Sequence, residues 1–145
     1  MRLNVKIIHL VFIFLLVTVS SFAQKKNKKE ISDTDHAKAT AIFIEASKER
    51  LLGNPANAAD LFKECLKVDP NNAAAMYELA TIYFNARKDN EAIEQISNAI
   101  KIEPKNEWYH MLLADIYSQL GKNEEAAKVF EILVNDFPKK PEFLY

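Results

Sequence analysis

The feature that most constrains this chain is an internal repeat of constant length. The positions of Pro70, Pro104 and Pro138 differ by 34 at each step. Four further sets share this interval: Ala46, Ala80 and Ala114; Ala58, Ala92 and Ala126; Phe62, Ile96 and Phe130; and Cys65, Ala99 and Leu133. Agreement of several sets on one period predicts a stack of similar units, because each unit buries its apolar face only against its neighbours.

Each period contains two helical patterns. Residues 72–86 and 90–101 of the second period, and 106–120 and 123–136 of the third, carry apolar residues three and four positions apart. That spacing places them on one face of a helix. A proline follows each second pattern and ends it, because proline cannot continue the hydrogen-bond ladder. The whole chain has only two glycines, too few for a fold rich in tight strand turns.

The short connections inside each period carry turn signals. Gly53 and Gly121 follow the first helical pattern of the first and third periods. Helices commonly end at a residue in the left-handed backbone conformation, which glycine adopts readily. Arg87 holds this place in the second period and is expected to weaken that turn or alter its shape. The repeated alanines predict close approach of neighbouring helices. The set that includes Phe62 and Phe130 is expected to fill the gaps between helix pairs.

The repeated residues resemble the tetratricopeptide repeat (TPR) family, whose pattern runs W-x2-L-G-x2-Y and then alanine, aromatic, alanine and proline. The second period matches this pattern with Met76, Leu79, Ala80, Tyr83, Ala92, Ile96, Ala99 and Pro104. The third matches it with His110, Leu113, Ala114, Tyr117, Ala126, Phe130, Leu133 and Pro138. The first matches from Gly53 through Ala58, Phe62, Cys65 and Pro70, but has Glu45 and Glu49 where leucine and tyrosine would stand. This departure suggests a first helix that is rotated or shifted by one residue.

The resemblance covers residues 37–145 and implies an all-α fold. Its expected architecture is a right-handed α-solenoid of about three TPR helix-turn-helix units. These units are residues 37–70, 71–104 and 105–138, followed at 139–145 by the start of a further helix. The fold alone does not fix a function.

In the resembled family, the first helices line a concave groove that holds a segment of a partner protein. The corresponding places here are Ala74, Tyr77, Thr81, Phe84 and Asn85 in the second unit, and Trp108, Met111, Asp115, Ser118 and Gln119 in the third. Some members grip a terminal carboxylate with lysine and asparagine, whereas this chain has Thr81 and Asp115 where such donors are expected. Aromatic rings and a methionine suit apolar or extended segments instead. The alternative is that Tyr77, Phe84 or Trp108 is covered by adjacent helices and belongs to the core.

The segment 1–23 has the layout of a secretory signal peptide. Arg2 and Lys6 precede an apolar run over 7–19, and small residues stand at Ser21 and Ala23. The run is about 13 residues long, shorter than the roughly 20 that span a bilayer. We therefore expect export, with a periplasmic, extracellular or cell-envelope location. An uncleaved membrane anchor is the alternative, and we expect membrane contact only through such an uncleaved N-terminus.

A basic segment follows the expected cleavage point. Four lysines lie between residues 25 and 29, and we interpret residues 24–36 as a flexible, solvated spacer. Contact with anionic lipid or nucleic acid is the alternative reading of this segment. The chain has 19 basic and 20 acidic residues, so the balance of charge gives no reason to expect nucleic-acid binding.

No residue pattern in the sequence predicts a catalytic, cofactor or metal site. The lone cysteine, Cys65, excludes an internal disulfide and falls on a small, inward-facing repeat position. Asp33, Asp35 and His36 stand just before the first expected helix, where acids cap free amides and favour the helix dipole. His110 has no second histidine at zinc-ligand spacing. Metalloprotease, serine-hydrolase and phosphate-loop motifs do not occur in the sequence.

These observations favour a non-catalytic protein-interaction scaffold or assembly adaptor that acts outside the cytoplasm and binds a protein or peptide. Two alternatives stay open: the TPR accessory region of a larger exported enzyme, and a membrane-tethered adaptor. The last helix of the third unit is also expected to leave Val129, Ile132 and Leu133 partly uncovered. Self-association through this C-terminal end, or a partner, would cover them.

We predict that the mature protein begins at Gln24, because the small residues Ser21 and Ala23 fit a signal peptidase pocket. Intact-mass measurement of protein purified from its native host checks this. A mass that retains residues 1–23 would favour the anchored alternative.

Overall fold

The structure is a computed structural model in which residues 31–137 are described. Its helices are α2 (Asp33–Leu51), α3 (Pro55–Val68), α4 (Ala73–Asn85), α5 (Asp89–Ile102), α6 (Glu107–Gln119) and α7 (Asn123–Asp136). These residues contain no strand, so the prediction of an all-α fold is confirmed. The predicted signal peptide (1–23), residues 24–30 of the predicted spacer and the predicted further helix (139–145) lie outside the described residues.

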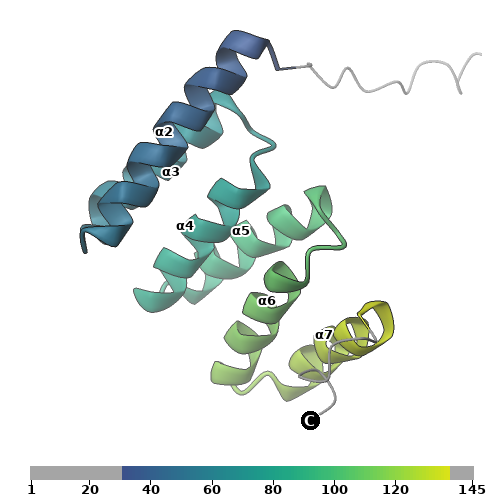
Figure 1. The fold of residues 1–145 in the computed structure, drawn as a ribbon. Helices are drawn as coiled ribbons and strands as arrows, with labels where there is room; N and C mark the ends of the chain where they lie inside the picture. The colour runs from purple at the N-terminus through teal and green to yellow at the C-terminus, as the bar shows by residue number, and fades with distance from the viewer. Residues whose placement is uncertain (1–30, 138–145) are drawn as a thin grey trace, which may run out of the picture. The chain divides into compact units, whose positions relative to one another are not determined.

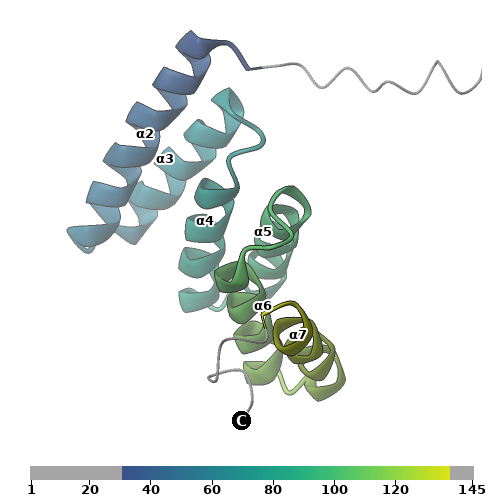
Figure 2. The ribbon, with the colours of Figure 1, turned by 45° about the vertical axis from the view of Figure 1, so that its right-hand side comes forward.

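The helices pack as three successive pairs, α2 with α3, α4 with α5 and α6 with α7 (Figure 1). Each second helix also contacts the first helix of the next pair, as α3 contacts α4 and α5 contacts α6. A further contact joins the first helices α4 and α6. Figure 2 shows the pairs following one another along the stack. This is the arrangement of an α-solenoid, in which each unit contacts only its neighbours.

The three turns within the pairs share one backbone shape. Gly53 and Gly121 have φ values of 80° and 67°, and Arg87 has a φ of 58°. In each turn the backbone N–H of this residue donates to a carbonyl three residues earlier at 3.1 Å. Arg87 therefore does not alter the shape of its turn, contrary to one expectation, although a side chain in the left-handed region costs about 1–2 kcal/mol.

The first helix begins earlier than the sequence predicted. Ser32 is its N-cap, and the Ser32 hydroxyl accepts a hydrogen bond from the Asp35 backbone N–H at 3.1 Å. Asp33, Asp35 and His36 therefore lie inside the first turn and not before it, so the predicted boundary of the spacer at residue 36 is wrong. The two acids still favour this position, because the amino end of a helix dipole is positive.

The core contains the residues that recur at the repeat interval. The repeated alanines are buried, and so are Cys65, Ala99 and Leu133. Phe62 and Ile96 are fully buried, as predicted, but the equivalent Phe130 is 42 % exposed. The prediction that Phe130 fills a gap between helix pairs is wrong, because α7 belongs to the last described pair.

The expected uncovered surface on α7 is only partly present. Val129 and Leu133 are buried, whereas Ile132 is 40 % exposed. The prediction therefore fails for the first two residues and holds for the third. The third unit itself supplies a helix, α6, that packs along α7.

The first described helix, α2, departs from the repeat at two positions that inner helices bury. Glu45 and Lys48 occupy the register positions of Leu79 and Ile82, which are buried in α4. In α2 both residues are exposed and form an ion pair at 3.0 Å. Ala46 is fully buried, like the equivalent Ala80, so the helix is neither rotated nor shifted. The two charged residues make this part of the α2 surface polar, although Ile44 and Leu51 of the same helix are also exposed.

We predict that Phe62→Ala and Phe130→Ala differ sharply in their effect on stability, although the two residues share a repeat position. Removing a fully buried phenylalanine costs about 3–5 kcal/mol, because a cavity remains. Phe130 is already partly exposed, so its loss is expected to cost about 1 kcal/mol. Urea unfolding followed by circular dichroism measures both values, and equal losses would contradict the packing described here.

Candidate partner-binding groove

The first helices α2, α4 and α6 share the face on which the groove was predicted. Two side-chain contacts connect these helices directly. Arg50 of α2 forms an ion pair with Glu78 of α4 at 3.0 Å. Tyr77 of α4 lies beside Tyr109 of α6, with ring centroids 5.3 Å apart and planes tilted by 30°. These contacts connect the three first helices along the candidate groove.

None of the predicted groove residues is fully buried. Tyr77, Thr81, Phe84 and Met111 are half-buried, whereas Ala74, Asn85, Trp108, Asp115, Ser118 and Gln119 are exposed. Tyr77 and Phe84 pack against the cluster of buried residues that the second and third units share. The core interpretation is therefore partly right for these two rings, which each keep some surface accessible to a partner.

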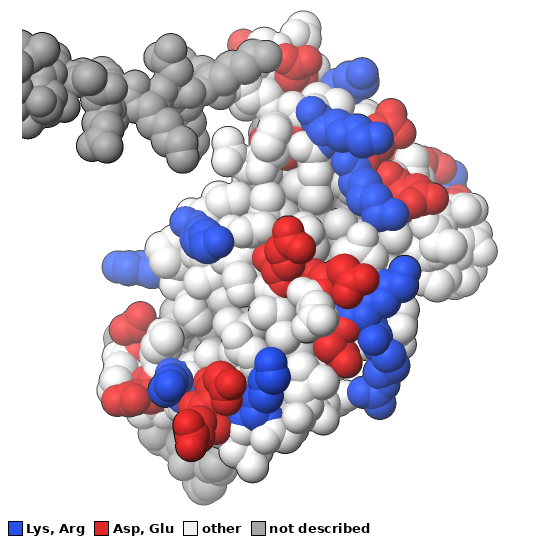
Figure 3. Space-filling view, turned by 180° about the vertical axis from the view of Figure 1, so that it is seen from behind, with Lys and Arg blue, Asp and Glu red and all other residues white. Residues whose placement is uncertain are grey.

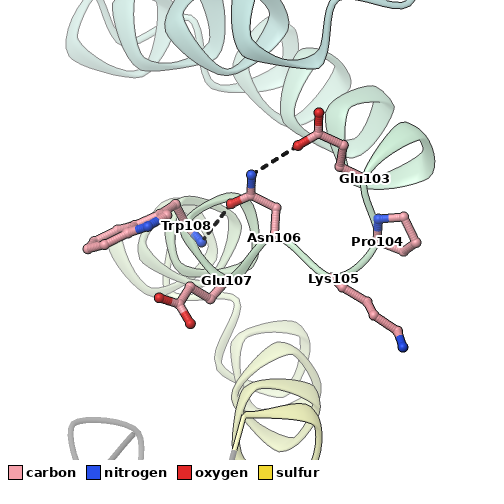
Figure 4. Close-up of a pocket in the computed structure, with 6 residues that line it drawn as sticks. All are labelled: Glu103, Pro104, Lys105, Asn106, Glu107 and Trp108. Atoms are coloured by element: carbon pink, nitrogen blue, oxygen red, sulfur yellow. Dashed lines mark hydrogen bonds between the residues drawn. The ribbon is translucent and has the colours of Figure 1, made fainter.

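Trp108 is the most exposed of the predicted aromatic residues, at 58 %. It follows a short turn in which Asn106 donates to Glu103 at 3.0 Å and accepts from the Trp108 backbone N–H at 3.2 Å. The residues from Glu103 to Trp108 line a surface pocket of about 610 Å³. Figure 4 shows the indole pointing away from Glu103 and Pro104. The capped turn thus fixes the start of α6 and presents the indole to solvent.

The charges in the groove lie close to the tyrosine. Burial raises the pKa of Tyr77, as do the carboxylates of Glu78 and Asp115, whereas the Arg50 guanidinium opposes the shift. Partial desolvation also raises the pKa of the Asp115 carboxyl. A raised carboxyl pKa means that the surroundings disfavour the charged form. Asp115 is thus an anion that a cationic or hydrogen-bonding group would stabilise.

Sequence reasoning missed two groove residues. Arg50 and Glu78 were not predicted, yet their ion pair crosses the face between α2 and α4. Arg50 lies one repeat interval before the predicted groove residue Phe84, so applying the period to the first unit would have identified it. The repeat pattern could not identify Glu78, because this residue lies next to a predicted groove residue, Tyr77, and not at a groove position itself.

His110 and Cys65, which the sequence assigned no functional role, are both buried and hydrogen-bonded to backbone carbonyls. His110 is buried, and its Nε2 donates to the Pro104 carbonyl at 2.9 Å. The Cys65 thiol is fully buried and donates to the Ala39 carbonyl at 3.3 Å. Among residues 31–137, no three histidine, cysteine, aspartate or glutamate side chains are grouped as a metal site would require. Within the same part of the chain, no helix has the length and apolar character to cross a membrane.

The face opposite that of Figure 1 has a mixed charge pattern. Figure 3 shows basic and acidic side chains interspersed there, with broad uncharged areas between them. Neither sign dominates this face, which is consistent with the near balance of charge in the sequence. A large field of one sign, as nucleic-acid-binding faces present, is not visible in this view.

Comparison with known families places these features in context. The family model described as "Anaphase-promoting complex, cyclosome, subunit 3", a model of TPR type, matches residues 34–132. No curated protein sequence matches the chain significantly.

Solved structures with the same arrangement of helices include three TPR-containing proteins. The first TPR of Spaghetti (RPAP3), bound to the HSP90 peptide SRMEEVD, has a TM-score of 0.68 and 22 % identity over 74 % of this chain and 86 % of that one. MamA has a TM-score of 0.67 and 24 % identity, covering 72 % of this chain and 61 % of that one. A mutant Thermobaculum terrenum O-GlcNAc transferase has a TM-score of 0.67 and 18 % identity, covering 74 % of this chain and 21 % of that one. At these identities the likeness concerns the fold alone.

We predict that Cys65 does not react with thiol reagents while the protein is folded. Burial raises the pKa of this thiol to about 11, with a smaller contribution from the Asp69 carboxylate. The thiolate is the reactive form, so both the raised pKa and the burial slow the reaction. Labelling with Ellman's reagent at pH 8 is expected only in denaturing urea. Rapid labelling without urea would contradict a structural role for Cys65.

Proposed function

Because this chain belongs to the tetratricopeptide repeat family, within the group described as anaphase-promoting complex, cyclosome, subunit 3, we propose that it is a non-catalytic protein-interaction scaffold. In this proposal, a segment of a partner protein lies across α4 and α6. The chain acts outside the cytoplasm, in the periplasm, at the cell envelope or in the extracellular space. The signal peptide predicted for residues 1–23 motivates this location.

The observation that carries the proposal is the pair of aromatic residues on neighbouring first helices. Trp108 exposes more than half of its surface, and the half-buried Tyr77 is held in place by Tyr109. Large amphipathic rings concentrate binding energy when a partner covers them. Their supporting helices are fixed by core packing, so little conformational entropy is lost on binding.

The chemistry of the groove indicates what kind of segment it accepts. The SRMEEVD peptide on the RPAP3 domain carries acidic residues near its end. In this chain, Thr81 and Asp115 stand where lysine or asparagine donors would grip a terminal carboxylate. An apolar or extended internal segment therefore fits the middle of this groove better than an acidic terminus.

A second candidate function is an accessory role within a larger exported enzyme. The similarity to the O-GlcNAc transferase motivates it, because the matched region is only about a fifth of that chain. The membrane-tethered adaptor depends on whether residues 1–23 are retained, and the mass measurement described above distinguishes it.

We predict that Tyr77→Ala and Trp108→Ala each weaken partner binding by about 2 kcal/mol, or about thirtyfold. Capture on the immobilised protein, followed by mass spectrometry, identifies the partner, and titration calorimetry then compares the variants. Trp108 is the only tryptophan, so its fluorescence also reports binding directly.

Lys128→Ala is the control for these variants, because Lys128 is exposed on the second helix α7 and is not one of the predicted groove residues. Circular dichroism establishes that each variant folds. If both aromatic variants fold and bind the partner as tightly as the wild type, the groove proposal is wrong.

A further inference from the structure

A surface cavity lies beside the predicted groove, between α3 and the end of α4. Its volume is about 790 Å³, within the range of sites that bind small molecules or inserted side chains. Ala59, Ile82, Tyr83 and Ala86 form apolar parts of its wall. We call this cavity the α3–α4 cleft. Thr81 and Asn85 also line it, so it is continuous with the predicted groove.

Two small residues open the α3–α4 cleft. Ala59 and Ala86 face it, whereas the equivalent positions one repeat later hold Ile93 and Leu120. Ile93 packs against the core cluster of the second and third units. The first junction between helix pairs thus lacks two branched side chains that the second junction has, which leaves space for an apolar group from outside.

Cations surround this space. Arg50, Lys63 and Lys88 line the cleft, and Asp60 is its single acidic residue. Lys63 pairs with Asp60 at 2.8 Å, and Arg50 pairs with Glu78 outside the cleft. The Lys88 ammonium lies 5.8 Å from the centre of the Tyr83 ring. After these pairings, Lys88 supplies the uncompensated positive charge at the rim.

The equivalent residues at the second junction, between α5 and α6, carry less positive charge than those of the cleft. One repeat later, Arg50 is replaced by Phe84, Lys63 by Ser97 and Thr81 by Asp115. The lysine is retained as Lys122, which lies 5.8 Å from the centre of the Tyr117 ring. Positive charge and open apolar space therefore coincide at the first junction and are not a general feature of the repeat.

We propose that the α3–α4 cleft binds a peptide segment of the partner in which an apolar side chain stands next to an aspartate or glutamate. The apolar side chain enters the space beside Ala59 and Ala86, and the carboxylate pairs with Lys88 at the rim. This inference rests on the proposed function, because the same partner segment continues into the groove. It places the acidic residue and its apolar neighbour at the cleft, and a further apolar part of the same segment over Tyr77 and Trp108.

The test uses a displayed library of random dodecapeptides, selected on the full-length protein. Enriched peptides are expected to carry an apolar residue next to an acidic one. Ala59→Ile and Ala86→Leu fill the cleft with the side chains that the second junction already accommodates. Each is expected to weaken binding about tenfold or more, which corresponds to about 1.4 kcal/mol. Ala86 is exposed at the end of α4, so Ala86→Leu remains informative if Ala59→Ile disturbs folding.

Two matched lysines test the charge. Lys88→Gln is expected to weaken binding of the acidic peptides about tenfold, whereas Lys122→Gln, the same change on an equivalent lysine, is expected to leave it unchanged. The inference is overturned if the enriched peptides lack acidic residues, or if they bind both cleft-filled variants as tightly as the wild type.

The groove variants separate this inference from the proposed function. Peptides that lose affinity with Trp108→Ala but not with Ala86→Leu would overturn the cleft and support the groove. Peptides that lose affinity only with the cleft variants would support the cleft and count against the groove. Failure to enrich any peptide would count against both.

Discussion

Close contact between helices at the repeated alanine positions is the interaction on which the rest of this structure depends. Ala46, Ala80 and Ala114 on the first helices are fully buried, and so are Ala58 and Ala92 on the second. A methyl side chain lets two helix backbones approach closely, and larger residues such as Phe62 and Ile96 then fill the remaining space. A larger residue at these alanine positions would separate the helices and disturb the spacing along the whole stack.

The same principle explains how the described stack differs at its two ends. At the N-terminal end, Glu45 and Lys48 replace the apolar residues that inner helices bury, although Ile44 and Leu51 of α2 are exposed as well. At the other end, Phe130 and Ile132 keep the apolar character of inner positions but are partly exposed. Helix pairs that use one packing rule thus acquire different surfaces through a few substitutions at equivalent positions.

Variation between equivalent positions also creates the two candidate binding surfaces. The groove has accessible rings because Trp108 stands at an exposed position and Tyr77 at one that the neighbouring helix α6 covers only in part. The α3–α4 cleft exists because Ala59 and Ala86 stand where Ile93 and Leu120 stand one repeat later. Regular packing keeps the helices in place, and departures from it give each junction its own shape and charge.

The sequence by itself determined the repeat, the turns and nearly all of the core. The repeat period is a local signal, and each unit contacts only its neighbours, so the pattern carries over directly to packing. It did not predict that Phe130 is exposed or that Val129 and Leu133 are buried, because these outcomes depend on which helix lies beside α7. The Arg50–Glu78 ion pair and the cleft were likewise decided only by tertiary structure. Both join residues from different helix pairs, and their distance and shared space depend on how those pairs stack.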